Sequence, residues 1–253
     1  MVRFNHPMAE QIPALWALWQ EAFGDEDEYL EIFYSKAFSQ NRCMQTEENG
    51  KALAALYWFD CREGDQKLAY IFGVAVAPSA RGKGYCRALM NATFDRLAEL
   101  GYDGAVLVPA RPSLYEMYEK LGFKKFGGVT ETEYLASQTP AKMRLLGEEE
   151  YTRLRNEYLP QGGVIQEGEN VAFLAARTHL YAGEDFVLSF VPGMGEFVVE
   201  FLGNIQKAPD IVRALGREKL VFRTPGDGRD FAVYHSLTKV GTPPKYFGIP
   251  FDF

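Results

Sequence analysis

The sequence predicts a mixed α/β (α+β) fold whose C-terminal half is rich in strands. Three observations lead to this prediction: apolar residues recur at helical spacing over residues 7–38, a hairpin and a nearly continuous apolar strand follow, and strand signals dominate after residue 164. Of the 253 residues, 47% are hydrophobic and 24% are charged, which is the balance of an ordinary globular protein. A chain of this length can bury a complete core without disulfide support.

The first elements are two helices and a hairpin. Residues 7–23 are expected to form a helix because their apolar side chains lie on one helical face, and residues 29–38 repeat the pattern. The stretches 42–48 and 52–61 are expected to pair as a hairpin. The Asn49-Gly50 dipeptide between them favours the positive backbone angles of a tight turn.

A buried strand and two further helices come next. Residues 68–77 are nearly all apolar, which is typical of a central strand that is covered on both faces. Apolar positions up to Leu100 mark one face of a helix that Gly101 ends. A short strand is predicted over residues 105–108, and a helix with Pro112 in its first turn follows.

The C-terminal half is expected to form a separate unit. Residues 137–146 are predicted to be a linker because SQTPAK is polar and contains a proline. A helix over residues 147–159 and a short helix at residues 209–215 accompany strands predicted at 171–178, 185–191, 196–202, 219–224 and 231–237. We therefore expect one domain over residues 1–136 and a smaller, β-rich domain over residues 147–253.

The turn after Pro78 is the segment that most directly indicates chemistry. It joins the apolar strand to an amphipathic helix, and the first backbone amides of a helix are unpaired and lie at the positive end of its dipole. Glycines allow a ligand to approach such a backbone closely, so the turn is expected to hold a phosphate group. Its residues are Arg81, Gly82, Lys83, Gly84, Tyr85, Cys86 and Arg87. The segment fits neither GxxxxGK[ST] nor GxGxxG.

This segment resembles the coenzyme A loop of the GCN5-related N-acetyltransferase (GNAT) family. The family pattern [QR]-x-x-G-x-[GA] is matched at Arg81 and Gly84, whereas Cys86 stands where glycine or alanine is usual. A second segment, LYEMYEKLGF over residues 114–123, is similar to the family's LYEKLGF helix end. The resemblance covers roughly residues 1–135 in element order.

The resemblance implies a fold, a co-substrate and a reaction. The fold is a largely antiparallel, twisted sheet flanked by helices, followed here by a smaller GNAT-like domain that lacks the coenzyme loop. Acetyl-CoA is the implied co-substrate, and a primary amine of a small molecule or peptide attacks its thioester directly in a ternary complex, without a metal. The implied coenzyme contacts are the main chain of Val74, Ala75 and Val76 for the pantetheine arm and the amides of residues 82–87 for the pyrophosphate.

The resemblance identifies the catalytic residues less directly than the coenzyme contacts. By family position, Tyr118 is the candidate general acid for the departing thiolate, and the alternative is an aromatic that packs the helix on the sheet. Many relatives use a glutamate on the central strand, but residues 68–77 contain no carboxylate. In relatives resembling the enhanced-intracellular-survival acetyltransferases, the C-terminal carboxylate reaches the active site, so we expect the Phe253 carboxylate or Asp252 to line the acceptor site. The alternative is a final edge strand. Glu200 either faces that site or pairs with an arginine.

Charge and composition limit the classes of partner that the protein is expected to bind. The 27 basic and 34 acidic residues give a net charge of −7, which argues against a nucleic-acid binder. With this charge, the acidic residues 25–28 favour a cationic amine acceptor, and a solvated helix cap explains them equally well. No apolar run reaches the ~18–20 residues of a membrane span. The histidines and the three cysteines form no metal-binding pattern, and an odd cysteine count favours a reducing, cytoplasmic location.

Two alternatives to an enzyme remain open at this point: an inactive acyl-CoA-binding or regulatory module, and a structural protein without a ligand. Exposed strand edges in the C-terminal half offer a surface through which two copies can pair as a homodimer.

Overall fold

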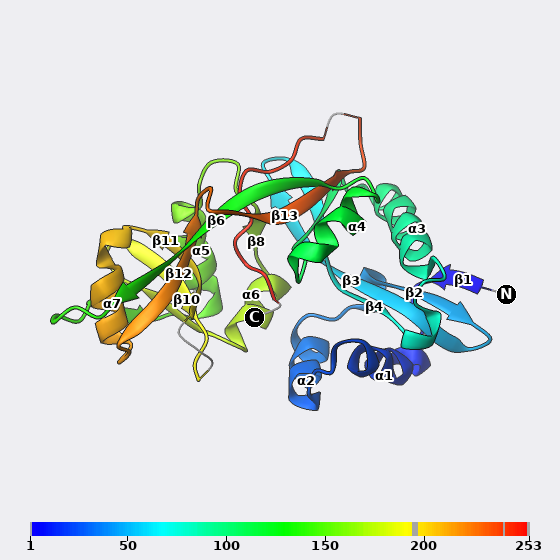
Figure 1. Cartoon of the computed structure of the whole chain (residues 1–253), viewed down its shortest axis with the longest axis horizontal. Helices are drawn as coiled ribbons and strands as arrows, with labels where there is room; N and C mark the ends of the chain where they lie inside the picture. The colour runs from blue at the N-terminus through cyan, green and yellow to red at the C-terminus, as the bar shows by residue number, and fades with distance from the viewer. Residues whose placement is uncertain (1, 194–196, 240, 252–253) are drawn as a thin grey trace.

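A computed structural model describes residues 2–193, 197–239 and 241–251 (Figure 1). The chain forms a mixed α/β structure around one open, mostly antiparallel sheet in the order β1-β2-β3-β4-β5-β13-β6-β12-β11-β10-β9-β7, with β8 pairing on β3. Among the strand pairs formed by the described residues, β4–β5 and β11–β12 are parallel and the others are antiparallel. The predicted fold class is confirmed.

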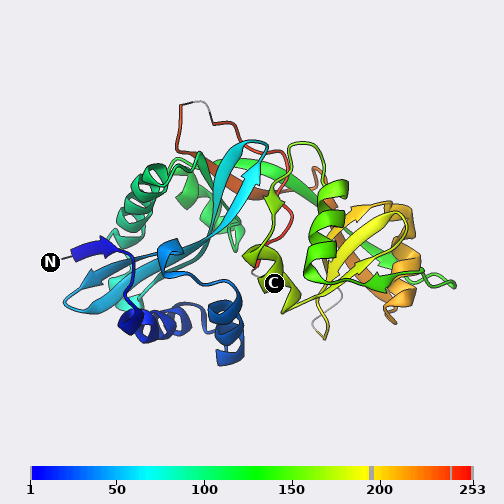
Figure 2. The ribbon, with the colours of Figure 1, turned by 180° about the vertical axis from the view of Figure 1, so that it is seen from behind.

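The N-terminal part of the chain (residues 2–136) holds the first six strands and four helices. Its elements are β1 (Val2–Asn5), α1 (Ile12–Phe23), α2 (Asp27–Lys36), β2 (Cys43–Glu48), β3 (Lys51–Glu63), β4 (Gln66–Val76), α3 (Tyr85–Glu99), β5 (Gly104–Leu107), α4 (Tyr115–Glu119) and β6 (Lys124–Leu135). Helices α1 and α2 lie on one face of the sheet and α3 on the other (Figures 1 and 2).

Strand β3 shows why this layered arrangement forms. Successive side chains of a strand point to opposite faces. Tyr57 and Phe59 pack in the core cluster beneath α1 and α2, whereas Leu56 and Trp58 pack in the cluster beneath α3 and α4. The strand is therefore apolar at nearly every position, because both of its faces are covered.

The predicted turns of the N-terminal part are confirmed. Asn49 and Gly50 both have positive φ, at 52° and 79°, and they connect β2 to β3. Gly24 has φ 76° and ends α1 by donating its amide to the Gln20 carbonyl oxygen. These positions need a backbone conformation that most L-residues avoid, which is why the sequence alone located them.

The C-terminal part (residues 137–251) contains more helix than its sequence suggests. Its elements are β7 (Arg144–Leu145), α5 (Glu148–Tyr158), β8 (Ile165–Gln166), α6 (Glu169–Ala175), β9 (His179–Ala182), β10 (Phe186–Phe190), β11 (Phe197–Gly203), α7 (Ala208–Ala214), β12 (Lys219–Pro225) and β13 (Arg229–Ser236). The strand predicted over residues 171–178 is wrong, because these residues belong largely to α6. Val171, Phe173 and Leu174 are buried, and so short an apolar run does not distinguish a strand from a buried helix.

Each part of the chain contributes a strand to the other. Strand β6 pairs with β12 along its length, from Lys219↔Leu135 to Pro225↔Val129. Strand β13 pairs with β5 on one side, as at Val233↔Leu107, and with β6 on its other side. Strands β6 and β13 run side by side across the molecule (Figure 1). The sheet of the N-terminal part is thus completed by residues from near the end of the described chain.

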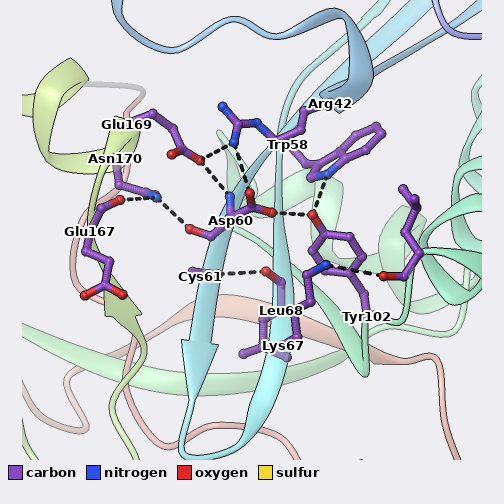
Figure 3. A network of polar contacts seen from close by, with 11 residues as sticks. Arg42, Trp58, Asp60, Cys61, Lys67, Leu68, Tyr102, Glu167, Glu169 and Asn170 are labelled. Carbon is purple, nitrogen blue, oxygen red and sulfur yellow. Dashed lines mark hydrogen bonds and ion pairs between the residues drawn. The ribbon is translucent and has the colours of Figure 1, made fainter.

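A polar network fastens α6 to the end of β3 (Figure 3). Arg42 Nη1 lies 3.0 Å from Asp60 Oδ2 and 3.2 Å from Glu169 Oε1. The Asn170 side-chain amide donates to the Asp60 carbonyl oxygen at 2.8 Å, and the Tyr102 hydroxyl donates to the Asp60 carboxylate. The network fixes the position of α6, whose C-terminal end borders the cavity described next.

Candidate active site

The candidate site lies where β4 and β5 separate. The two strands pair in parallel only from Leu68↔Gly104 to Tyr70↔Val106 within the described register, and β4 continues to Val76. The Ala77 amide donates to the Leu53 carbonyl oxygen of β3. Because backbone groups alternate along an antiparallel strand, those of the preceding Val76 point away from β3, into the gap left by β5.

A bulge in β4 shapes the wall of this gap. The register with β3 shifts between Ala55↔Ala75 and Tyr57↔Phe72, so Gly73 and Val74 together lie opposite one residue of β3. Gly73 has φ 58°, and a Cβ atom there would lie 2.6 Å from the Trp19 ring. Both the backbone angle and the close approach of α1 therefore require glycine.

A cavity of about 880 Å³ occupies the gap. Its walls come from α1, α2, β4, the segment after β5, and α4, and the C-terminal part adds Arg177, Val191 and Phe251. Apolar and aromatic side chains dominate the walls, and such a cavity with a few polar groups is typical of a small-molecule site. Two of the sequence-predicted site residues, Val74 and Tyr118, line it.

The predicted acidic segment borders the same cavity. Asp25, Glu26 and Glu28 are among its lining residues. The Trp19 indole Nε1 donates to Asp25 Oδ2 at 2.7 Å, which fixes one of these carboxylates against the aromatic wall. The segment therefore brings three carboxylates to the wall of the cavity.

The predicted phosphate turn follows β4 directly. Residues 78–80 form one 3-10 turn, and Gly82 and Gly84 then take φ values of 75° and 83° before α3 begins at Tyr85. The first helical hydrogen bond runs from the Ala88 amide to the Gly84 carbonyl oxygen, which leaves the amides of residues 85–87 for a ligand. A Cβ atom at either glycine meets nothing within 4 Å, so the space over the turn is open.

The charged side chains of the turn are exposed. They are Arg81, Lys83 and Arg87. The Arg81 Nε donates to the Val76 carbonyl oxygen at 3.2 Å, which ties the turn to the free edge of β4. Burial raises the pKa of the Cys86 thiol, so this side chain stays protonated and acts as a small neutral group beside the turn. The turn is thus a donor-rich, cationic surface that a diphosphate fits.

The other sequence-predicted residues have different surroundings. Ala75 is buried and pairs with Ala55 of β3. Tyr118 is 6% exposed and contacts Phe123 edge-on. The Tyr115 hydroxyl donates to the backbone carbonyl oxygens of Asp230 and Phe231, so this side chain attaches α4 to β13.

Glu200 pairs with an arginine, as one of the two readings of the sequence expected. Its carboxylate lies 2.7 Å from Arg155 Nε, and both side chains are buried. The hydroxyls of Tyr151 and Tyr246 also donate to it, at 3.3 and 3.0 Å. Glu200 is absent from the cavity lining.

The C-terminal tail reaches the cavity. Phe251 is buried among aromatic rings, and its carbonyl oxygen accepts hydrogen bonds from Arg177 Nη1 at 2.7 Å and from the Tyr29 hydroxyl at 3.4 Å. Asp252 and Phe253, the residues considered for the catalytic base, lie outside the described residues.

Sequence reasoning missed several residues of the cavity wall. Trp19 and Phe72 were assigned only to elements, and Arg177 fell in the segment predicted to be a strand. Arg177 lies with its guanidinium carbon 4.5 Å from the centre of the Tyr29 ring. Nothing local in the sequence marks this residue, because its place depends on how the two parts of the chain pack.

Within the described ranges, no group of three or more His, Cys, Asp or Glu side chains is placed to hold a metal ion. In the same ranges, none of the helices combines the length and apolar character needed to cross a bilayer.

The fold resembles that of solved acetyltransferases over nearly the whole chain. A GCN5-related N-acetyltransferase from Kribbella flavida aligns with a TM-score of 0.71 and 17% identity, over 94% of this chain and 72% of that one. Another from Anabaena variabilis gives 0.75 and 14%, over 94% and 73%. Eis1 from Mycobacterium abscessus gives 0.67 and 13%, over 94% and 74%. At these identities the likeness concerns the fold.

The similarity by sequence covers a shorter part of the chain than the similarity by fold. No curated protein matches the chain. A family model described as an acetyltransferase (GNAT) domain matches residues 4–126, which include the separated strands, the glycine turn and Tyr118. Residues 4–126 of the chain therefore match a GNAT acetyltransferase domain.

Proposed function

We propose that the protein is an acetyl-CoA-dependent N-acetyltransferase that acts on a primary amine of a small molecule or peptide. One observation carries the proposal: Asp25, Glu26 and Glu28 line the cavity between β4 and β5, and a cationic, glycine-containing turn follows the end of β4, the strand that forms one wall of this cavity. The turn suits the diphosphate of a coenzyme, and the carboxylates suit an amine.

The residues have distinct roles in this proposal. The backbone of Val74, Ala75 and Val76 lies along the pantetheine arm, and residues 81–87 hold the pyrophosphate. Acetyl-CoA supplies an activated acetyl thioester. Attack by the neutral amine forms the C–N bond and breaks the C–S bond, and Tyr118 gives its hydroxyl proton to the departing thiolate. The amine proton leaves to a base, for which the Phe253 carboxylate and Asp252 stay candidates.

The second part of the chain is proposed to be a degenerate copy of the first. Strand β11, helix α7 and parallel strand β12 repeat the order of β4, α3 and β5. The segment between β11 and α7, residues 204–207, has no Arg-x-x-Gly-x-Gly pattern. We therefore assign coenzyme binding to the N-terminal part and a supporting role in the acceptor wall to the C-terminal part, with the division at residues 137–146.

The test combines binding and turnover. Acetyl-CoA is expected to raise the melting temperature, and release of free thiol is expected with amines. Lys83→Glu puts a negative charge in the turn and should weaken acetyl-CoA binding at least about tenfold at low salt, which calorimetry measures. Lys51→Glu, on the exposed β2–β3 turn, is the matched control and should leave binding unchanged. Binding without turnover favours an inactive acyl-CoA-binding module, and no binding rejects the proposal.

The tail requires its own test. Deletion of Asp252 and Phe253 removes both candidate bases and retains Phe251, which is buried. If either removed residue supplies the base, turnover should fall about 100-fold or more while the dissociation constant for acetyl-CoA stays the same. Unchanged turnover would reject the proposed base.

A further inference from the structure

The side chains of the cavity walls indicate which kind of chemical group the acceptor carries in addition to its amine. Trp19 and Phe23 on α1, Tyr29 on α2, Phe72 on β4 and Phe251 from the tail bring aromatic rings to the cavity from four separate segments. Neighbouring rings lie at contact distance: Trp19 and Phe23 are 5.4 Å apart between centroids, and Trp19 and Phe72 are 5.6 Å apart. Such walls favour a flat apolar group and gain little from a polar one.

Phe23 is the exposed member of this aromatic wall. Its side chain is 47% exposed, although it lines the cavity and contacts the buried Trp19. A large apolar side chain that is half exposed at a cavity mouth can gain burial when a ligand enters. Phe23 is therefore placed to cover an apolar ligand, whereas the deeper rings are already packed.

Among the residues that line the cavity, the carboxylates all belong to one short segment, which lies next to this aromatic wall. Asp25, Glu26 and Glu28 come shortly after Phe23 in the chain, and none of them forms an ion pair with any described residue. These carboxylates can therefore attract an ammonium group. A second ammonium, or the hydroxyls of an amino sugar, would be pressed against apolar walls with few partners, and unpaired polar groups there are costly.

Building on the proposed function, we propose that the acceptor is an arylalkyl monoamine, in which a single primary amine is joined by a short chain to an aromatic ring. The ring packs against Phe23 and its neighbours, and the ammonium is drawn to Asp25, Glu26 and Glu28 before it loses a proton and attacks the thioester. This class satisfies both halves of the cavity at once.

A panel of amines tests the class. Thiol release is measured with phenethylamine and tryptamine, with butylamine as a small apolar amine, and with spermidine and glucosamine as polar competitors. The arylalkylamines should exceed spermidine and glucosamine at least about tenfold in kcat/KM. A preference for spermidine or glucosamine overturns the inference while leaving the N-acetyltransferase intact. Release of no thiol with any amine contradicts the proposed function itself.

Matched variants locate the contact. Phe23→Ala should lower kcat/KM for phenethylamine about tenfold and leave butylamine within about twofold. The control is Phe4→Ala, on β1, where the side chain is similarly exposed at 38% and is not among the residues that line the cavity. Glu28→Gln should raise KM for both amines, whereas Glu31→Gln, one turn later on α2, should not. If Phe23→Ala affects both amines equally, the ring does not lie on this wall and the inference fails.

Discussion

Substitution of Gly73 by alanine should cost much more stability than the same change at another glycine of similar backbone angle. A Cβ atom at Gly73 would lie 2.6 and 2.7 Å from two ring atoms of Trp19 and 3.0 Å from Tyr57. The Trp19 ring cannot easily move, because it is 2% exposed, packs against Phe33 at 4.9 Å and donates its indole hydrogen to Asp25.

The expected magnitude has two contributions. A non-glycine residue in the left-handed region costs about 1–2 kcal/mol. Forcing a methyl group into a packed core costs about 1–3 kcal/mol more. We therefore expect Gly73→Ala to lower the free energy of unfolding by about 2–5 kcal/mol.

Gly64→Ala is the matched control. Gly64 has φ 55°, close to the 58° of Gly73, and a Cβ atom there meets nothing within 4 Å. Only the backbone cost applies, about 1–2 kcal/mol. Denaturant unfolding followed by tryptophan fluorescence measures both variants. Equal losses of unfolding free energy would refute the steric reasoning, and with it the close packing of α1 on the bulge of β4.

Three further predictions concern single side chains. Tyr118→Phe should lower kcat about 100-fold or more without changing the dissociation constant for acetyl-CoA; Tyr115→Phe, which loses only hydrogen bonds to β13, should keep kcat, and equal losses would make Tyr118 a packing residue. Glu200→Gln should lower the free energy of unfolding, measured with denaturant, by about 3–5 kcal/mol because its buried arginine partner loses its counter-charge. Glu157→Gln, in an exposed ion pair, should lower it by less than about 1 kcal/mol. Similar losses in the two variants would contradict the burial of the Glu200 pair. Burial lowers the pKa of His235, so its stabilising contribution is complete above the ordinary histidine pKa of about 6.5 and is lost as the pH falls below it. Between about pH 7.5 and about pH 5.5, wild type should therefore lose more unfolding free energy than His235→Gln, and parallel pH profiles would contradict this.

Local signals explain what the sequence could predict. The Asn49-Gly50 turn, the end of α1 at Gly24 and the glycine turn before α3 each depend on residues whose backbone preferences are strong and short-range. The nearly continuous apolar run of residues 68–77 likewise indicates burial on two faces, because alternate side chains of this strand reach different helix layers.

Long-range packing explains what the sequence could not predict. The segment around Phe173 is apolar in either conformation, and its helix is selected by contacts with β3 and the polar network at Asp60. Arg177 enters the cavity only because that helix is held there. The place of β13 between β5 and β6 depends on residues separated by a hundred positions or more, and neither spacing nor composition encodes such a neighbour.

The exchange of strands also bears on how the protein is made. During synthesis the ribosome delivers β5 and β6 long before β13, so the nascent N-terminal part lacks the strand between β5 and β6 until residues 229–236 emerge. Unpaired strand edges are prone to association with other chains, and such distant pairings form slowly. Completion of the N-terminal sheet therefore waits until residues 229–236 have been made, and a chaperone that shields its open edges has a defined interval in which to act.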